Sequence, residues 1–504
     1  MLSLRFSNEI MPKGAGLLFL IKLFFIITYS IVFSTLILYI SHQLHFPHHK
    51  AAKITATFLA YAGIFRLVTG FIGDRYLSYQ HILVIGFISL FVGCLLVSIP
   101  NTATLYWGIS AIMLGSGLMI APNCILTQLF PTHDHYREAA FYLNYVGINL
   151  GYMIGFSVSG YYQLSNAYSE LFQLAAIAAL IALLIILFNW QRLRFKSSEA
   201  RLNKRNDLFQ SMKGITLIIF IFCLARWFLE HLNISNIFIN SAAILMGLII
   251  IYFALQQTNQ AIRNKLILFL SLSLISIVFW TLSNLTPILL TLFIENNVNR
   301  NYLGMIIAPQ WVQIINSLVI ILGAPLVILF FNFLNKKGIG LKLATKFSIA
   351  LILVGASLIV LAIGVKFSNI EGLTNFNWIL ISYILQSLGE LFIVPVGFAM
   401  VGQLIEVDLQ GRMMAVWMML MGVGANLAGY ISSDFLLINQ TTNPHLTNAS
   451  YIVTFTTLGW LATFTGALLI LCTSYQLKLI TKKLRWSGTQ NNLPNSTPTL
   501  KKSP

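Results

Sequence analysis

Long apolar runs repeat along this chain, separated by short polar segments. Each run has about 20 residues or more, which is the length that an α-helix needs to cross a hydrocarbon core of about 30 Å. The runs are continuous, whereas membrane β-strands alternate apolar and polar positions and are about half as long. The pattern predicts fourteen membrane helices, at about residues 17–40, 52–73, 80–100, 104–125, 140–163, 169–190, 214–233, 236–255, 265–291, 310–334, 343–366, 376–403, 411–435 and 452–475.

Composition indicates the same class of protein. Hydrophobic residues occupy 57% of the 504 positions and charged residues 9%, which is too little charge for the surface of a soluble protein of this length. We therefore expect an all-α polytopic membrane protein. The run at 17–40 is longer than the apolar region of a secretory signal, so we expect it to remain as the first helix.

The distribution of positive charge predicts how the helices are oriented. Most of the 31 Lys and Arg residues fall in alternate connections, including a basic stretch at 191–213, and the other connections hold few. Since cytoplasmic loops are enriched in Lys and Arg, we expect a multi-pass protein of the plasma (inner) membrane with both termini in the cytoplasm. The net charge of +17 arises from these connections, so no soluble basic domain remains to bind nucleic acid.

The order of runs and linkers predicts the domain organisation. Six runs precede the basic stretch, two follow it, and six more complete the chain. We expect an N-terminal six-helix bundle at 14–190, a basic cytoplasmic linker at 191–213, an inserted helix pair at 214–256, a C-terminal six-helix bundle at 265–475 and a cytoplasmic tail at 476–504. Within the tail, the polar segment SGTQNNLPNSTPTLKKSP (487–504) is expected to be disordered.

No motif for enzymatic chemistry is present in the sequence. The chain has no GxxxxGK[ST] loop, no HExxH and no GxSxG. Its cysteines lie singly in apolar runs without a His partner at metal-binding spacing; they are Cys94, Cys124, Cys223 and Cys472. We expect a carrier rather than an enzyme, with neither a metal nor a cofactor.

Six short motifs have the order and spacing found in one transporter family. They are FIGDRYL (71–77), GSGLMIAPN (115–123), REAAFYLNYVGINLG (137–151), APQWVQIIN (308–316), SLGELFIVPVG (387–397) and MMAVWMMLMGVGANLAG (413–429). In these motifs the chain resembles the proton-dependent oligopeptide transporters (POT/PTR family), a branch of the major facilitator superfamily. The resemblance implies two six-helix bundles, a helix pair inserted between them as in bacterial members, and a peptide-like substrate.

The chain departs from this family at positions that usually carry charge. The family's E-x-x-E-R motif aligns with IKLFFIITYS (21–30), which has Lys22, Phe25 and Ile26 in place of the charged residues. Ala121 stands near the usual lysine of helix four, and Asn284 replaces an acid of helix seven. Because Glu390 is the one buried ionisable residue of the family that is kept, we expect proton coupling to be weakened or lost.

Glu390 is an isolated charge near the middle of an apolar run. It lies about 14 residues into the helix at 376–403, which is roughly 21 Å along its axis and close to the bilayer midplane. An ionised carboxylate at that depth is costly unless it faces water, a cation or a substrate. Glu390 therefore either lines a central cavity, where the resemblance implies that it receives a substrate's ammonium, or pairs with a fixed buried cation.

Other ionisable residues within the runs have competing interpretations. Arg66 stands where the family commonly has a proline. It either holds a substrate carboxylate through its guanidinium, or it binds a structural partner such as a helix-end carbonyl or an acid of a neighbouring loop, and the sequence favours neither interpretation. Lys22 is expected to reach the cytoplasmic surface. Arg226 and Glu230 are spaced i,i+4 and are expected to form a pair.

The resemblance adds polar and aromatic candidates to the substrate site, although any one such residue more often serves helix packing. These are Tyr29, Tyr142, Asn149, Trp280, Asn284, Trp311, Gln313, Asn316, Trp417 and Asn426. Asp74 and Arg75 resemble the superfamily's inter-helix latch, and Pro122 and Pro395 are expected to bend helices at the gates.

Two functions remain open from the sequence. The first is a monomeric secondary transporter of di- or tripeptides, or related small amine-bearing solutes, that works by alternating access in the lipid bilayer, with protons as possible co-substrates. The second is a non-transporting relative, a sensor or assembly partner, that keeps the fold. Retention of Glu390 and of the helix-bending prolines favours transport.

Overall fold

The protein was analysed as a computed structural model, which describes residues 14–129, 137–193, 207–302, 304–337, 341–405 and 407–490. Its first half contains α1 (Ala15–Leu38), α2 (His48–Arg75), α3 (Tyr79–Ser98), α4 (Thr102–Leu118), α5 (Ala121–Leu129), α6 (Arg137–Leu164), α7 (Tyr168–Phe188), α9 (Asp207–Glu230) and α10 (Leu232–Gln256). Its second half contains α11 (Gln260–Asn284), α12 (Thr291–Asn297), α13 (Pro309–Lys336), α14 (Leu343–Lys366), α15 (Phe376–Leu404), α16 (Val407–Ile438) and α17 (Pro444–Gln490).

All fourteen apolar runs are helical, which confirms the predicted all-α membrane fold. Thirteen helices of the described chain are long and apolar enough to cross a membrane. The run at 140–163 forms α6, a 28-residue helix outside that set, whose buried side chains include Asn144 and Asn149. The last helix, α17, continues past the expected end at 475 to Gln490, so helical structure extends into the segment predicted as tail. Residues 491–504 lie outside the described chain.

Strands in the described chain are short and lie in the connections. Val298–Asn299 (β1) pairs in parallel with Thr374–Asn375 (β4), and Asn301–Tyr302 (β2) pairs antiparallel with Met305–Ile306 (β3). The end of the molecule that carries the loops after α2, α10 and α13 is called the basic end, because Arg75, Arg263 and Lys337 lie there. The other end, which carries these strands, is called the opposite end.

Several predicted spans are not simple helices. The span at 104–125 divides into α4 and α5, and Pro122 is the second residue of α5. A proline lacks the backbone N–H of a regular helix and its ring clashes with the preceding turn, which accounts for the break. Two π-helical turns, η1 (Tyr39–Gln43) and η3 (Thr286–Leu290), follow α1 and α11 at corresponding places in the two halves. Such turns occur frequently at functional sites.

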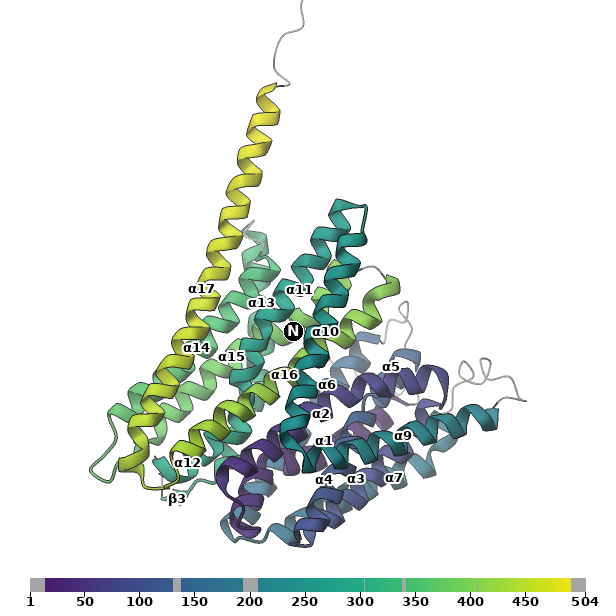
Figure 1. The fold of residues 1–504 in the computed structure, drawn as a ribbon, viewed down its shortest axis with the longest axis vertical. Coiled ribbons are helices and arrows are strands. Elements are labelled where there is room, and N and C mark those ends of the chain that lie inside the picture. Colours follow the sequence, from purple (N-terminus) through teal and green to yellow (C-terminus); the bar gives the residue numbers. More distant parts are fainter. Residues whose placement is uncertain are drawn as a thin grey trace, which may run out of the picture.

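The helices form two groups that meet along a few pairs. Helix α1 packs on α6 and α7, and α3 packs on α4 and α7, whereas α14 packs on α15 and α17 and α11 packs on α16. Between the groups, α2 packs on α16 and α6 on α13. Gly422 allows the first of these contacts, because a Cβ there would lie 2.9 Å from the Ala60 carbonyl oxygen. Figure 1 shows the groups converging at the end with α12 and β3 and diverging toward the other ends of their helices.

The inserted helices α9 and α10 lie on different parts of the molecule. Helix α9 packs on α4, while α10 packs on α11 and α16, and in Figure 1 the two helices spread apart from their shared connection. Arg226 and Glu230 form the expected ion pair at 2.7 Å, and the Arg226 guanidinium lies 5.2 Å from the ring of Trp107 on α4. The ion pair therefore neutralises its own charges, and through Arg226 it also holds α9 against α4.

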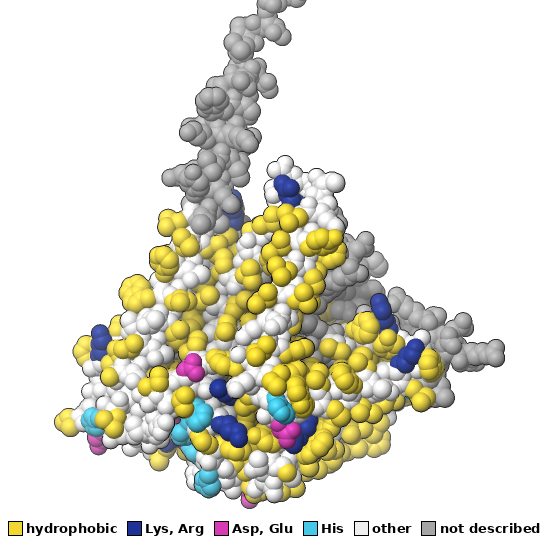
Figure 2. Space-filling view, viewed as in Figure 1, with side chains coloured by type: hydrophobic (Ala, Val, Ile, Leu, Met, Phe, Trp, Pro, Cys, Tyr) yellow, Lys and Arg dark blue, Asp and Glu magenta, His cyan; other side chains and the backbone are white. Residues whose placement is uncertain are grey.

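The described surface is strongly apolar. Figure 2 shows hydrophobic side chains over most of the face in view, with the histidines gathered toward its lower end. Large exposed hydrophobic residues are frequent on α9, α10 and α13; examples are Phe220, Ile244 and Leu322. In water such a surface would promote aggregation, so it is suited to contact with lipid acyl chains.

Candidate functional site

Glu390 lies on α15, one and a half turns before Pro395. Its Oε2 atom accepts a hydrogen bond of 2.8 Å from Nδ2 of Asn316 on α13. Glu390 is half-buried and has no ion pair with any residue that the structure describes. The described chain therefore does not support the alternative that Glu390 pairs with a fixed buried cation. A neutral amide orients the carboxylate but leaves its negative charge available to a ligand.

Two cations lie on the other helix group. Lys22 on α1 is only 6% exposed, and its ammonium lies 5.4 Å from the ring of Phe25. The expectation that Lys22 reaches the surface is therefore wrong, because the packing of α1 with its neighbours α2, α5, α6 and α7 buries the side chain. Arg66 on α2 is half-buried and lies within electrostatic range of Lys22 and of Tyr29.

Tyr152 connects the two sides of this site. It lies on α6, within electrostatic range of Tyr29 and Arg66 in its own group and of Glu390 in the other. Tyr29 is buried, and its ring lies 6.0 Å from that of Phe58 on α2. Tyr152 is thus within electrostatic range of a cation on α2 and of a carboxylate on α15. We call Lys22, Tyr29, Arg66, Tyr152 and Glu390 the central site.

Several predicted site residues are engaged elsewhere. Asn149 and Asn284 donate hydrogen bonds to carbonyl oxygens one turn earlier in their own helices, at 3.0 and 2.7 Å. Trp280 and Trp417 are buried, and the Trp417 ring lies 5.9 Å from that of Phe347 in the packed interior of the second group. These placements fit helix packing better than contact with a ligand.

Two further candidates join helices rather than the central site. Nδ2 of Asn426 donates a hydrogen bond of 2.6 Å to Oδ1 of Asn236, which ties α16 to the inserted helix α10. Nε1 of Trp311 donates a hydrogen bond of 2.9 Å to the Ser157 carbonyl oxygen, which ties α13 to α6. Gln313 is buried, and its Nε2 has no hydrogen-bond partner in the described chain.

The predicted gating residues are described in part. Arg75 is exposed, with its guanidinium 4.7 Å from the ring of Phe71, and Pro395 lies within α15. The side chains of Tyr142 and Asp74 lie outside the described part of the structure. Their predicted roles in binding and gating stay predictions.

Polar contacts close the two helix groups together at the opposite end. His42 on η1 lies 3.4 Å from Glu295 on α12, measured from Nε2 to Oε2. Gln163 on α6 donates a hydrogen bond of 3.2 Å to the other oxygen of Glu295, and Tyr168 on α7 contacts His42 at 3.3 Å. At the basic end, neither α4 nor α5 forms a packed pair with α15 in the described chain.

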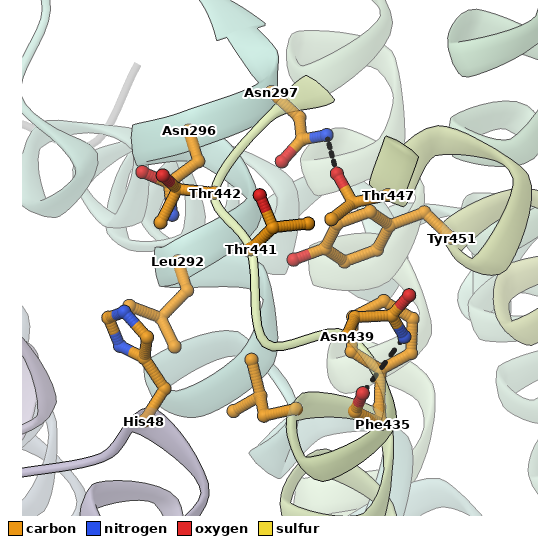
Figure 3. Close-up of a pocket in the computed structure, with 11 residues that line it drawn as sticks. His48, Leu292, Asn296, Asn297, Phe435, Asn439, Thr441, Thr442, Thr447 and Tyr451 are labelled. Atoms are coloured by element: carbon orange, nitrogen blue, oxygen red, sulfur yellow. Dashed lines mark hydrogen bonds between the residues drawn. The ribbon is translucent and has the colours of Figure 1, made fainter. Parts of the chain in front are cut away.

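A small cavity also lies at the opposite end (Figure 3). It has a volume of about 10 Å³ and lies between His48 on α2, Leu292 on α12 and Tyr451 on α17. Asn297 donates a hydrogen bond of 2.8 Å to Thr447 on its rim. The space accommodates about one water molecule, so this cavity is too small to bind a dipeptide.

The fold and the central site define a polytopic α-helical carrier of the major facilitator type. A sequence model of the POT family matches residues 77–450. The chain belongs to this family, which consists of peptide transporters and not of enzymes.

Similar proteins agree with this assignment. Dipeptide and tripeptide permease A of Citrobacter koseri is 30% identical over 481 residues, covering 94% of this chain and 93% of that protein. The permease A of Escherichia coli (strain K12) is 29% identical over 482 residues, with 94% of both chains covered.

Solved structures show the same fold. A peptide transporter POT in complex with sulfate has a TM-score of 0.76 and 22% identity, covering 93% of this chain and 96% of that one. A POT family transporter in complex with 5-aminolevulinic acid has a TM-score of 0.77 and 22% identity, covering 92% of this chain and 97% of that one.

The central site was found from the sequence only in part. Glu390 stood out by its isolation, and Tyr29 and Arg66 were candidates. Tyr152 was missed, since a tyrosine in an apolar helix has no distinguishing pattern. Lys22 was noticed but assigned to the surface, because its enclosure depends on how α6 and α7 pack around α1.

Proposed function

We propose that this protein is a secondary transporter of di- and tripeptides, or of related small amine-bearing solutes, working by alternating access with weak or absent proton coupling. The observation that carries the proposal is the carboxylate of Glu390, which accepts a hydrogen bond from Asn316 and has no ion pair within the described chain. Relatives along nearly the whole chain are named dipeptide and tripeptide permeases.

The proposed roles follow from charge. Glu390 receives the ammonium of the solute, and Arg66 holds a carboxylate through its planar guanidinium. Tyr29 lies within electrostatic range of Arg66, and Tyr152 within range of Arg66 and Glu390, so we assign their hydroxyls to hydrogen bonds with the solute's backbone. Binding at a midplane site between two helix groups is the arrangement that alternating access requires.

The proposed orientation places the basic end in the cytoplasm, together with both termini, because Lys and Arg concentrate there. In that orientation the contacts of His42, Gln163 and Trp311 join the two helix groups on the outer side, which supports our proposal of an inward-facing conformation of a monomer in the inner membrane.

Weak coupling follows from the loss of acids. Proton-driven uptake requires a group whose protonation changes between the two conformations, and Glu390 is the one acid at the central site among the described residues. If a proton and the solute's ammonium compete for this single carboxylate, the result is exchange of one cation for another rather than symport.

The test is transport of Ala-Ala in vesicles reconstituted with the purified protein, with and without an inward pH gradient. We expect saturable exchange without uphill accumulation. Uphill accumulation that a proton uncoupler abolishes would overturn the coupling proposal. Binding of dipeptides with no flux in either direction would instead support the alternative of a non-transporting sensor.

A further inference from the structure

The two inserted helices meet the same residue of the first helix group, Tyr61 on α2. The Tyr61 side chain is 1% exposed, and its ring stacks on that of Phe228 on α9, with the ring centroids 5.0 Å apart and the planes 18° from parallel. Its hydroxyl oxygen accepts a hydrogen bond of 3.3 Å from Oγ of Ser235 on α10. The segment around the turn between α9 and α10 is therefore attached to α2.

The same segment is bonded to the second helix group. Nδ2 of Asn426 on α16 donates hydrogen bonds to Oδ1 of Asn236 at 2.6 Å and to Oδ1 of Asn240 at 3.4 Å. The Asn426 side chain is 3% exposed, and lipid acyl chains could not replace these bonds. Because Ser235 and Asn236 are adjacent in the sequence, one turn of α10 bonds α2 and α16 at once.

These contacts lie beside the closest approach of α2 and α16. A Cβ on Gly429 of α16 would overlap the Cβ of Ala56 on α2, so the two backbones are in close contact there. Tyr61 lies five residues from Ala56, and Asn426 lies three residues from Gly429, in both cases toward the basic end. These offsets correspond to roughly 5–8 Å along the helix axes. The inserted pair thus bridges α2 and α16 next to their own contact.

We propose that the inserted helix pair is a clip that holds α2 and α16 together and so stabilises the conformation in which the opposite end is closed. The inference rests on the proposed alternating access and adds to it a role for α9 and α10. To open the opposite end, α2 and α16 must separate. Ser235 and Asn236 cannot follow both helices, because they are neighbours on one helix, so one of the two sets of hydrogen bonds must break.

The alternative is that α9 and α10 only cover apolar surfaces of the two groups. Helix α9 packs on α4, and α10 packs on α11, which agrees with either role. If the pair only covers these surfaces, loss of the bond between Tyr61 and Ser235 lowers the stability of the protein without changing how often its opposite end opens. The two roles therefore differ in the equilibrium between closed and open molecules.

The experiment measures the distance between spin labels attached to Ala103→Cys and Ile370→Cys, which are exposed at the opposite end of the two groups. Pulsed electron paramagnetic resonance of the reconstituted protein, with its natural cysteines replaced by serine, gives the fractions of molecules with a short and a long distance. Tyr61→Phe combined with Ser235→Ala removes both hydroxyls and keeps the aromatic stack, so the fold should be retained. We expect the ratio of open to closed molecules to rise about fivefold, the factor that corresponds to one net hydrogen bond of about 1 kcal/mol.

A second variant and a control accompany this measurement. Asn426→Leu breaks the other side of the clip and should raise the same ratio. Tyr39→Phe is the matched control, because the Tyr39 hydroxyl donates a hydrogen bond of 2.6 Å to the Val97 carbonyl oxygen within the first group. We expect this control to lower the stability of the protein and to leave the ratio unchanged.

An unchanged ratio in both bridging variants, in a protein whose opposite end opens when Ala-Ala is added, would overturn the inference and leave alternating access intact. An equal rise in Tyr39→Phe would also overturn it, because opening would then follow any loss of stability. If the opposite end opens in none of these proteins, with or without Ala-Ala, the proposed function fails together with the inference.

Discussion

Replacing Glu390 with Gln tests the central site most directly. The substitution keeps the length and shape of the side chain and removes only its charge. Asn316 can still donate its hydrogen bond, now to Oε1 of the amide, so the contact at 2.8 Å between α13 and α15 is retained. The charged share of that bond is lost, at about 1 kcal/mol, but a neutral amide is also less costly to enclose. We expect the free energy of unfolding to change by no more than about 1 kcal/mol.

Ligand binding should change far more than stability. Removing one partner of a buried, hydrogen-bonded charge pair typically costs 2–5 kcal/mol. A loss of about 3 kcal/mol raises Kd roughly 150-fold. The measurement is dipeptide binding by calorimetry, accompanied by a thermal unfolding curve of the same sample. Glu371→Gln is the matched control, since Glu371 is exposed in the loop before β4.

Two results would refute this reasoning. Unchanged binding of dipeptides by Glu390→Gln would show that the carboxylate does not receive the ammonium. Unfolding of the variant in detergent, with Glu371→Gln stable, would show that the charge of Glu390 serves the fold. The second result would return Glu390 to the structural role that the sequence left open.

Two further predictions concern contacts outside the central site. Glu295→Gln should weaken the closed opposite end by replacing the carboxyl oxygen that contacts His42, which spin-label distances across that end would detect as lengthening. Glu170→Gln, exposed at the start of α7, should leave these distances unchanged. Asn426→Leu should destabilise the protein by about 1 kcal/mol, because the hydrogen bonds from α16 to Asn236 and Asn240 on α10 are lost inside the membrane while Asn236 still accepts one from Asn240. An unchanged unfolding curve would contradict this.

The membrane helices could be predicted from the sequence because their signal is local. An apolar run of sufficient length forms a helix in lipid whatever surrounds it, since its backbone groups have no other partner there. The breaks could be anticipated only where a proline marks them, as Pro122 does between α4 and α5. The π-helical turn η1 carries no such mark and could not be predicted.

Side-chain roles were harder to predict because they depend on contacts between helices. Trp417 lies in a motif of the family, yet the structure surrounds it with Phe347 and the backbone at Gly397. Asn426 was assigned to the substrate site, whereas α10 provides it with Asn236 as a partner. A sequence pattern shows which residue is polar within the membrane, but the neighbouring helix decides what that residue bonds.

The charge of the central site also bears on the mode of transport. A carrier must enclose its site while it changes conformation, and enclosing an uncompensated charge costs several kcal/mol. Glu390 has no ion pair within the described chain, so the empty site encloses an unpaired carboxylate, whereas the ammonium of a bound dipeptide would pair with it.

The loaded carrier should therefore change conformation more readily than the empty one, and this asymmetry favours exchange over net uptake. Vesicles preloaded with unlabelled Ala-Ala should accumulate labelled Ala-Ala faster than empty vesicles, and Glu390→Gln should reduce the difference. Equal initial rates in preloaded and empty vesicles would contradict the argument, because the return of the empty carrier would then not be the slow step.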